Sequence, residues 1–389
     1  MNIVPGVDVD SYRLEPELAQ RIMTPALIIF MDKVDRNIQQ VISHAGGDPN
    51  RWRPHLKTTK IPQVWERLIE AGVRQFKCAT TREAAVLLEM LDRLGVRGAD
   101  LLIAYTLIGP ALERAADLAR QHDRTAVSVL CEDPDAVDSI PDHLGIFVDV
   151  NPMMNRTGIE IANRKQIIAV AQAAKSRFRG IHAYEGHIRD DEPDVRRTKA
   201  WEIYERVVDL CAHLVEQGCH VDELITSGAK TFLDALAYRP FAELSNTIHR
   251  ISPGTVVFSD TATQTAVTQA KLEPAAVVAS RVVSRPARNI ATCDAGSKAI
   301  AAEAGDPSAA VIGRPELMAL KPSEEHLPLS IESGPGPARG ELLLLVPRHV
   351  CPTVNLSQEV VLLSDDGSIQ VVPVSAAGHE LGLGASVGA

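Results

Sequence analysis

Short apolar runs alternate with longer segments of helical periodicity from residue 26 onward. The runs are five to seven residues long and end at polar or turn-forming residues, as buried strands do. The segments between them, such as "IPQVWERLIEAG" and "TREAAVLLEMLDRLG", carry apolar residues every three or four positions, which predicts helices. We expect eight strands, at 26–30, 52–57, 75–79, 100–105, 125–131, 145–150, 179–184 and 221–227.

Eight strand–helix units in about 230 residues indicate an α/β fold and are typical of a TIM-type (β/α)8 barrel. A doubly wound open sheet is the alternative that this pattern leaves open. Beyond about residue 262 the sequence pattern no longer alternates strands with helices. It predicts strands separated by turns of Gly, Pro and Asp, as in "AAVVASRVVSRP" and "GELLLLVP". We therefore predict a barrel domain over residues 22–262 and a C-terminal β domain over 263–389, which residues 1–21 join.

Composition and charge narrow the function classes. The chain has 389 residues, of which 45% are hydrophobic and 23% charged, and its net charge of -10 argues against a general binder of nucleic acid or anionic membranes. Its longest apolar runs are too short to span a bilayer, and the acidic N-terminus lacks the apolar core of a signal peptide. Six scattered cysteines suit a reducing compartment, so we expect a cytoplasmic protein.

The segment "RWRPHLKTTK" places Lys57 at the C-terminal end of the second predicted strand. Active sites of (β/α)8 barrels lie at that end of the strands. A lysine that points into a barrel mouth is partly desolvated, which lowers its pKa and favours the neutral amine that Schiff-base chemistry needs. A solvated surface lysine is the alternative.

Polar and small residues follow three further predicted strands. The loop "TSGAKTF" after the eighth strand is rich in backbone N–H groups, and loops after strands seven and eight are the usual phosphate site of this fold. A lysine combined with a phosphate-binding loop indicates pyridoxal phosphate as the cofactor. The candidate residues are Arg156 after strand six, Tyr184 and His187 after strand seven, Ser227, Gly228 and Ala229 after strand eight, and Gly254 and Thr255 in the turn "SPGT".

Six motifs, in order, resemble those of the D-threonine aldolase and D-serine dehydratase family, which has an alanine-racemase-like barrel. They are "RPHLKTTK", "DVNPMMNRTG", "YEGH", "TSGAKT", "SPGTVVFSD" and "VPRHVC", and the resemblance covers most of the chain. It implies that Lys57 binds the cofactor covalently and that Lys60 does not. It also implies a homodimer. The family has a histidine at the position of Thr59, which bears on the choice of substrate.

His349 and Cys351 lie two positions apart in "VPRHVCPTVNL". In a strand the two side chains share one face, and imidazole with thiolate suits zinc. A core cysteine beside a half-buried histidine is the alternative on spacing alone. The resemblance implies that these residues bind a divalent metal, with Zn²⁺ preferred and Mn²⁺ as the alternative. The HxC form of the motif is more similar to the dehydratases of the family than to its aldolases. Glu325 and His326 lie either near this metal or in a solvated turn.

These features together predict a pyridoxal phosphate- and metal-dependent lyase that acts on a D-β-hydroxy-α-amino acid, a small-molecule substrate whose side chain stays open. Elimination would give a 2-oxo acid and ammonia, whereas retro-aldol cleavage would give glycine and an aldehyde. Arg156 would contact the ring, Tyr184 would pack against it, and His187 is either a catalytic base, a cofactor contact or a structural histidine. The alternatives are an amino-acid racemase, which needs two bases and no metal, and a protein that binds pyridoxal phosphate without turnover.

Overall fold

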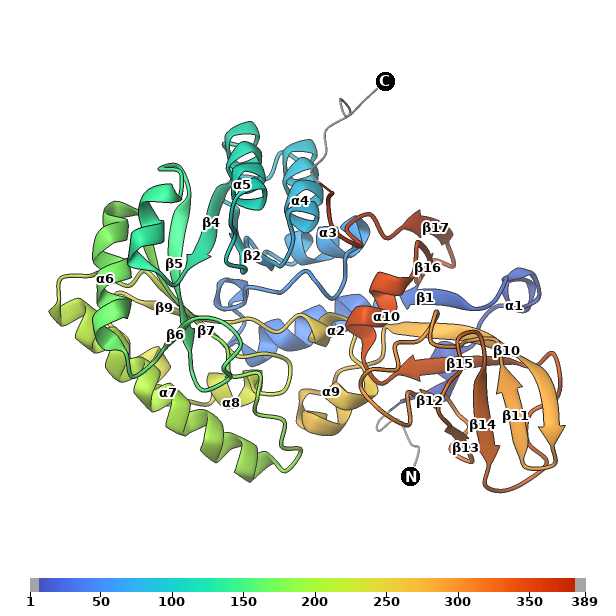
Figure 1. Ribbon diagram of the computed structural model, residues 1–389. Helices are drawn as coiled ribbons and strands as arrows, with labels where there is room; N and C mark the ends of the chain where they lie inside the picture. Colours follow the sequence, from blue (N-terminus) through green and yellow to red (C-terminus); the bar gives the residue numbers. More distant parts are fainter. Residues whose placement is uncertain (1–6, 382–389) are drawn as a thin grey trace. The chain divides into compact units, whose positions relative to one another are not determined.

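The computed structural model describes residues 7–381, which form two compact units (Figure 1). The antiparallel unit comprises the described residues up to Val41, Thr58–Arg67 and Thr255–Ala377. The parallel unit comprises Ile42–Lys57, Leu68–Gly254 and the described residues from Gly378 onward. The chain therefore passes from the parallel to the antiparallel unit directly after Lys57 and again directly after Gly254.

The parallel unit is built on a curled parallel sheet. Two isolated parallel bridges, Trp52 to Ile251 and His55 to Lys77, connect the segment 52–55 to both edge strands of this sheet. Because both bridges are parallel, the end of this segment lies at the same edge of the sheet as the carboxyl ends of the strands, where a site is expected. In sheet order the strands are β2 (Gln75–Cys78), β3 (Asp100–Ile103), β4 (Ala126–Cys131), β5 (Gly145–Asn151), β7 (Phe178–Ala183), β8 (Glu223–Thr226) and β9 (Ile248–Ile251), with the short β6 (Ile159–Glu160) beside β5.

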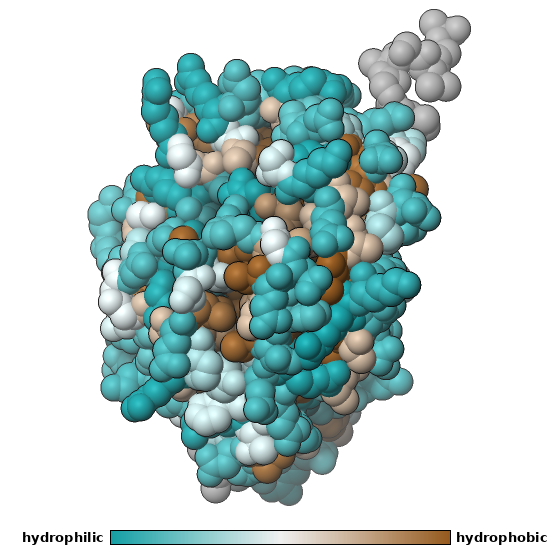
Figure 2. Space-filling model, turned by 90° about the vertical axis from the view of Figure 1, so that its left-hand side faces the viewer, coloured by the Kyte–Doolittle hydropathy of each residue, from teal (hydrophilic) through white to brown (hydrophobic). Residues whose placement is uncertain are grey.

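Amphipathic helices lie outside the curled sheet in Figure 1. In α4 the side chain of Thr80 caps the first turn by accepting from Glu83 N, and the buried residues recur every three or four positions. Figure 2 shows a face of the molecule, at the left of Figure 1, that is mostly hydrophilic with hydrophobic side chains gathered near its centre. The helices are α4 (Thr81–Arg93), α5 (Pro110–Gln121), α6 (Arg164–Ala174), α7 (Pro193–Glu216) and α8 (Phe232–Leu236), whereas α2 (Met31–His44) and α3 (Pro62–Glu70) extend across a unit boundary.

A buried ion-pair network occupies the amino-terminal ends of the parallel strands. Arg53 is fully buried and donates to both carboxylate oxygens of Glu223 at 2.7 Å and to Asp100 Oδ1 at 2.8 Å. Asp100 and Glu223 are the first residues of β3 and β8. Buried charges are tolerated when each is paired in this way. An apolar cluster inside the same sheet includes Leu130 and Phe147.

The antiparallel unit contains a nine-stranded sheet in which six strands form a closed barrel. β10 pairs with β15, β1 and β11, and two register shifts between β10 and β11 allow the long β10 to bend. The barrel runs β10 (Ala276–Ala287), β11 (Ile290–Cys293), β14 (Leu327–Ile331), β13 (Leu317–Ala319), β12 (Ala309–Val311) and β15 (Leu342–Pro347). The sheet continues through β1 (Ala26–Phe30), β16 (Glu359–Leu363) and β17 (Ile369–Pro373), and the helices are α1 (Pro16–Arg21), α9 (Thr261–Ala266) and α10 (Val350–Leu356).

The α/β fold with a parallel sheet and a following β domain is confirmed, but four details of the prediction are wrong. Residues 52–57 form two isolated bridges and a turn in place of the predicted strand. The apolar run at 26–30 is not a strand of the parallel sheet, because β1 pairs with β10 and β16. β9 was not predicted, since "IHRI" has only four positions and the two in the middle are polar. No helix was expected after residue 262, yet α10 lies there.

The two units also begin and end at different residues from the predicted domains 22–262 and 263–389. The described residues up to Val41 cluster with the antiparallel unit, because β1 is a strand of its sheet. The antiparallel unit begins again at Thr255, ahead of the predicted boundary. Within residues 7–381, none of the helices is both long enough and apolar enough to cross a membrane.

Candidate active site

Lys57 lies in a turn that directly follows the segment 52–55, and its side chain is exposed. Its backbone N–H faces His55 Nδ1 at 3.5 Å. The expected burial of Lys57 is wrong, because the chain leaves the strand direction at Leu56 and turns the side chain toward solvent. Lys57 directly follows the segment 52–55, and its exposed amine is accessible to an aldehyde.

The buried lysine of this region is Lys77, in β2. Its Nζ lies 3.4 Å from His182 Nε2, and only 3% of the residue is exposed. Burial lowers the pKa of Lys77 to about 7, and the positive charge of Lys57 acts in the same direction. A lysine with this pKa is partly neutral at neutral pH, unlike an ordinary surface lysine.

His182 connects Lys77 to Asp149. The imidazole Nδ1 lies 2.8 Å from Asp149 Oδ1, and both residues are buried. Because a carboxylate only accepts, Nδ1 carries the proton and Nε2 faces Lys77 as an acceptor. Burial is the largest cause that lowers the pKa of His182, and the charge of Lys77 is the next, so both disfavour the protonated ring. Asp149 Oδ2 is also buried and has no hydrogen-bond partner among residues 7–381.

Tyr184 and Arg156 lie together at the carboxyl ends of β5 and β7. The Arg156 guanidinium is 5.2 Å from the centroid of the Tyr184 ring, a cation–π distance. Both residues line one small cavity with Asp149. A Cβ at Gly186 would lie 2.3 Å from Tyr184 Cε1, and one at Gly228 would lie 2.9 Å from Cε2. Because neither glycine has a side chain, the Tyr184 ring fits between the loops that follow β7 and β8 without a clash.

The turn after β8 is held by the buried carboxylate of Glu185. Ser227 has a left-handed backbone with φ of 66°, and its N–H donates to Glu185 Oε2 at 3.2 Å. Glu185 Oε1 accepts from Tyr204 Oη at 2.7 Å and from Thr231 Oγ1 at 2.6 Å. Burial raises the pKa of Glu185, although the bonds from Thr231 and Tyr204 oppose this. Ser227 Oγ is buried without a partner among the described residues, so this turn has an unused donor for a phosphate oxygen.

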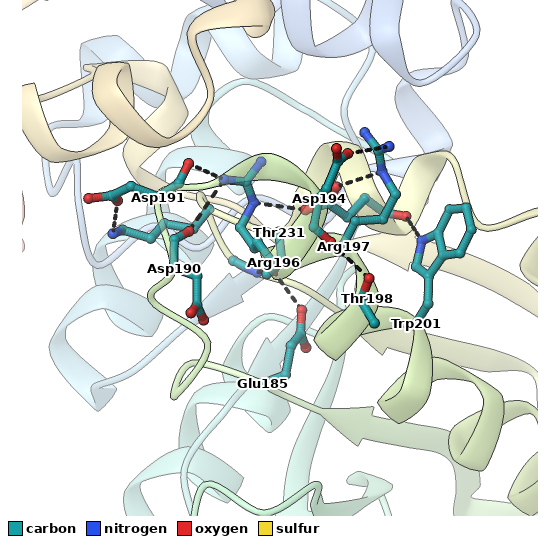
Figure 3. A network of polar contacts seen from close by, with 12 residues as sticks. Glu185, Asp190, Asp191, Asp194, Arg196, Arg197, Thr198, Trp201 and Thr231 are labelled. Carbon is teal, nitrogen blue, oxygen red and sulfur yellow. Dashed lines mark hydrogen bonds and ion pairs between the residues drawn. The ribbon is translucent and has the colours of Figure 1, made fainter.

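A second network fixes the loop that follows Glu185 (Figure 3). Arg196, fully buried in α7, donates to Asp234 Oδ2 at 2.9 Å and to the carbonyl oxygens of Asp190 and Asp191 at 3.4 and 3.3 Å. Lys230, in the loop after β8, donates to Asp191 Oδ1 at 3.0 Å. The loops after β7 and β8 are thus tied to each other and to α7.

The metal-ligand motif lies in the antiparallel unit at the start of a helix. His349 immediately precedes α10 and Cys351 is in its first turn, so the prediction that they share one face of a strand is wrong. Cys351 Sγ lies 3.1 Å from Thr58 Oγ1 and 3.4 Å from Thr255 Oγ1. The predicted residues Thr255, His349 and Cys351 are therefore brought together with Thr58.

The imidazolium form of His349 and the thiolate form of Cys351 stabilise each other. Their mutual hydrogen bond is the largest cause that raises the pKa of His349 to about 9. Burial would raise the pKa of Cys351, but the hydrogen bond and charge of His349 outweigh it and lower the pKa. His349 Nδ1 also lies 2.5 Å from Glu303 Oε1, so Nε2 is the ring nitrogen that faces Cys351 and would bind a metal in place of that hydrogen bond. Thiolate and imidazole are both ligands that zinc accepts. Residues 7–381 bring together no group of three or more His, Cys, Asp or Glu that could hold a metal ion.

Thr59, where the family motif has a histidine, is buried in the antiparallel unit. Its Oγ1 accepts a hydrogen bond from Trp65 Nε1 at 2.7 Å. Lys60 is also buried, and its Nζ donates to the carbonyl oxygen of Ala376 at 3.3 Å. In this chain Thr59 and Lys60 therefore help to pack the segment that follows Lys57.

The remaining predicted residues have varied surroundings. His187 is exposed, Ala229 is half-buried in the loop after β8, and Gly254 is buried. Glu325 is exposed and forms an ion pair with Lys298 at 2.9 Å. His326 is exposed in the same turn, so the solvated-turn interpretation of this segment holds.

Sequence reasoning missed Lys77, Asp149, His182 and Glu185. The first three lie within strands that were correctly predicted as buried, in "QFKCA", "GIFVDV" and "RGIHAY". A charged residue inside a buried apolar run was the available signal, because such a group needs a partner. The pairing of the three residues depends on strand order and register, which the sequence pattern does not give.

Two family models match the chain. The model "Alanine racemase, N-terminal domain" matches residues 29–261, and the model "Putative serine dehydratase domain" matches residues 275–363. The first match covers more than half of the chain, and its limits include the whole parallel sheet. The second contains the strands β10 and β15 and the motif of His349 and Cys351.

Relatives of known activity match over nearly their full lengths. A D-threonine aldolase of Arthrobacter sp is 26% identical over 373 residues, which cover 92% of this chain and 93% of that protein. A 3-hydroxy-D-aspartate aldolase of Paracoccus denitrificans (strain Pd 1222) is 27% identical over 382 residues, 92% of each chain. The crystal structure of D-threonine aldolase from Filomicrobium marinum aligns with a TM-score of 0.80 and 26% identity over 92% of this chain and 96% of that one.

Proposed function

The chain belongs to the D-threonine aldolase and D-serine dehydratase family, with its alanine-racemase-like fold, and we propose that it is a pyridoxal phosphate-dependent lyase of D-β-hydroxy-α-amino acids. The observation that carries this proposal is the turn after β8. Its buried Ser227 Oγ has no partner among the described residues, and Glu185 holds the backbone in place. Such a turn at the carboxyl end of the sheet suits a phosphate group.

The other cofactor contacts follow from the same end of the sheet. We assign the covalent link to Lys57, whose exposed amine follows the segment 52–55. Tyr184 would pack against the cofactor, and Arg156, at 5.2 Å from the Tyr184 ring, would contact the ring system of the cofactor. When bound, pyridoxal phosphate withdraws electrons from the substrate's Cα. Further phosphate contacts are assigned to Gly228, Ala229, Gly254 and Thr255.

His349 and Cys351 would hold a divalent metal, zinc in first place. When bound, the metal acts as a Lewis acid toward the substrate's β-hydroxyl group. Glu303 orients the His349 ring, and Thr58 and Thr255 hold the Cys351 thiol. Peptide bonds join these two threonines to Lys57 and Gly254.

Retro-aldol cleavage is the first reaction that we propose, because the two relatives described above are aldolases and match more than 90% of this chain. It gives glycine and an aldehyde. Elimination to a 2-oxo acid and ammonia is the second candidate. The HxC form of the metal motif favours it, as does the match of residues 275–363 to a serine dehydratase domain.

The proposal is tested by proton NMR of the products. The protein, supplied with pyridoxal phosphate and Zn²⁺, is incubated separately with D-threonine, D-serine and D-3-hydroxyaspartate, with the L-enantiomers and the K57A variant as controls. Glycine with an aldehyde identifies the aldolase, and a 2-oxo acid with ammonia identifies the dehydratase. Interconversion of the enantiomers without cleavage would identify a racemase, and no change in any sample would leave a protein that binds the cofactor without turnover.

We also propose that the parallel unit is a closed (β/α)8 barrel. The segment 52–55 would be its eighth member, between β9 and β2. The bridges Trp52–Ile251 and His55–Lys77 support this closure. Lys57 would then stand at the mouth of the barrel, as its assignment to the cofactor requires.

A further inference from the structure

The buried chain of Lys77, His182 and Asp149 has no role in the reaction described so far. The three residues are 3–4% exposed and come from three strands, β2, β7 and β5. Their contacts are 3.4 Å between the amine and the imidazole and 2.8 Å between the imidazole and the carboxylate. Burying three ionisable groups is costly unless they act together, so the cluster calls for a function.

The direction of the hydrogen bonds makes Lys77 the active end of the chain. Asp149 Oδ1 accepts from His182 Nδ1, so His182 Nε2 offers its lone pair to the Lys77 amine. Asp149 thereby fixes the tautomer of His182, and His182 in turn orients Lys77.

Lys77 is held in an environment where its proton is easily exchanged. Burial is the largest cause that lowers its pKa to about 7, and Lys57 is the next. Near neutral pH both the ammonium and the amine are therefore populated. Three positively charged groups near Lys77 lower its pKa: Lys57, Arg53 and Arg156. Glu185 raises it, and the His182–Asp149 pair forms a hydrogen bond with the Lys77 amine.

We propose that Lys77, His182 and Asp149 form a buried proton relay that takes up and returns the proton of Lys57. This inference rests on the assignment of Lys57 as the cofactor lysine. Before Lys57 binds the cofactor aldehyde, its ammonium must lose a proton. An N–H bond of Lys57 breaks, its electron pair stays on that nitrogen, and a new N–H bond forms at Lys77.

The two lysines together keep one positive charge throughout this transfer. When Lys57 leaves the cofactor again, the same proton returns to it and Lys77 becomes neutral. Lys77 thus acts as an acid–base group toward Lys57, and it affects the substrate only through Lys57. Its neutral side chain is stabilised by the hydrogen bond with His182, and no other oxidant, reductant or co-reactant is needed.

The experiment measures how fast the cofactor-free full chain binds pyridoxal phosphate, by stopped-flow absorbance between pH 6.5 and 9. The K77M variant should be slower than the wild type by about a hundredfold at pH 7.5, a typical contribution of a positioned acid–base group. Its rate should then follow the ordinary ionisation of a lysine. K298M makes the same chemical change at a lysine that is exposed in the antiparallel unit, and its rate should equal that of the wild type.

Two further measurements separate proton transfer from a structural role. Arg cannot release its proton in this pH range, so K77R should be as slow as K77M, whereas a purely structural role of the positive charge would be rescued by Arg. Nitrogen NMR of the wild type with 15Nζ-labelled lysine should show one amine that titrates near pH 7 and is missing from K77M.

The outcomes distinguish the two proposals. A wild-type protein that shows no absorbance change with pyridoxal phosphate would overturn the proposed function, and the relay with it. A wild type that binds the cofactor, with K77M equally fast at every pH, would overturn the relay alone. Recovery of the wild-type rate in K77R would also overturn it.

Discussion

Replacing Glu185 by Leu should destabilise the parallel unit and weaken cofactor binding together. The carboxylate accepts from three buried donors, Tyr204 Oη, Thr231 Oγ1 and Ser227 N. Each buried donor left without a partner costs about 1–3 kcal/mol. The variant no longer buries a carboxylate, and leucine adds apolar contact, so we expect a net loss near the low end, about 3 kcal/mol in the free energy of unfolding.

The same geometry predicts a reversal of sign in a double-mutant cycle. In the wild type, Y204F removes a good hydrogen bond and should cost about 1 kcal/mol. In the E185L background, Y204F removes a hydroxyl that has lost its acceptor, and it should stabilise by about the same amount. E185Q keeps an acceptor for part of the network and should be less destabilised than E185L.

The assay is urea denaturation at pH 7, followed by circular dichroism, of the wild type, E185L, E185Q, Y204F and the double mutant E185L/Y204F. Pyridoxal phosphate affinity is measured by absorbance titration. E185L should bind the cofactor about tenfold more weakly, because Ser227 loses the contact that fixes its left-handed turn. If Y204F destabilises both backgrounds equally, the three donors do not depend on Glu185, and this reasoning is refuted. Unchanged cofactor affinity in E185L would refute the claim that Glu185 holds the Ser227 turn in its cofactor-binding conformation.

Further predictions concern pH, metal, cofactor and assembly. Burial lowers the pKa of His249 from 6.5 to about 3. Between these pH values the unfolded chain binds more protons than the folded chain, so the free energy of unfolding decreases as pH falls from 6.5 toward 3. In urea denaturation, H249Q should reduce this slope by up to about 1.4 kcal/mol per pH unit. E303Q should weaken zinc binding by about 10–100-fold in a chelator competition, since Glu303 orients His349, and equal affinity would contradict this role. G228A should remain folded yet bind pyridoxal phosphate more weakly, because the added Cβ lies 2.9 Å from Tyr184 Cε2; an unchanged dissociation constant would show that the ring can move freely. The homodimer expected from the family resemblance should appear in light scattering, and a fully active monomer would contradict it.

The buried parallel strands were predictable because each is a short apolar run bounded by polar residues. The same rule misassigned residues 26–30, since an apolar strand with both faces buried reads alike in a parallel or an antiparallel sheet. β9 was missed because its four residues "IHRI" include two polar ones. α10 was missed because its seven residues, "VCPTVNL", are too short to show a helical period.

The candidate site was predictable where fold position dictates it. Tyr184 and the loop at Ser227 follow the strands β7 and β8, and such strand ends are visible in the sequence, whereas Lys57 follows the segment 52–55. The contact of Lys77 with His182 was not predictable, because the two residues are 105 positions apart and meet only through the order and register of the strands. The exposure of Lys57 likewise depends on the turn that follows it, which the motif alone does not describe.

Reductive trapping tests the central claim most directly. The protein loaded with pyridoxal phosphate is treated with sodium borohydride, digested, and mapped by mass spectrometry, with K57A treated in parallel. The account predicts a pyridoxyl group on the peptide that contains Lys57 and none in K57A. A pyridoxyl group on Lys77 or on any other lysine, or no modified peptide in the wild type, would contradict it.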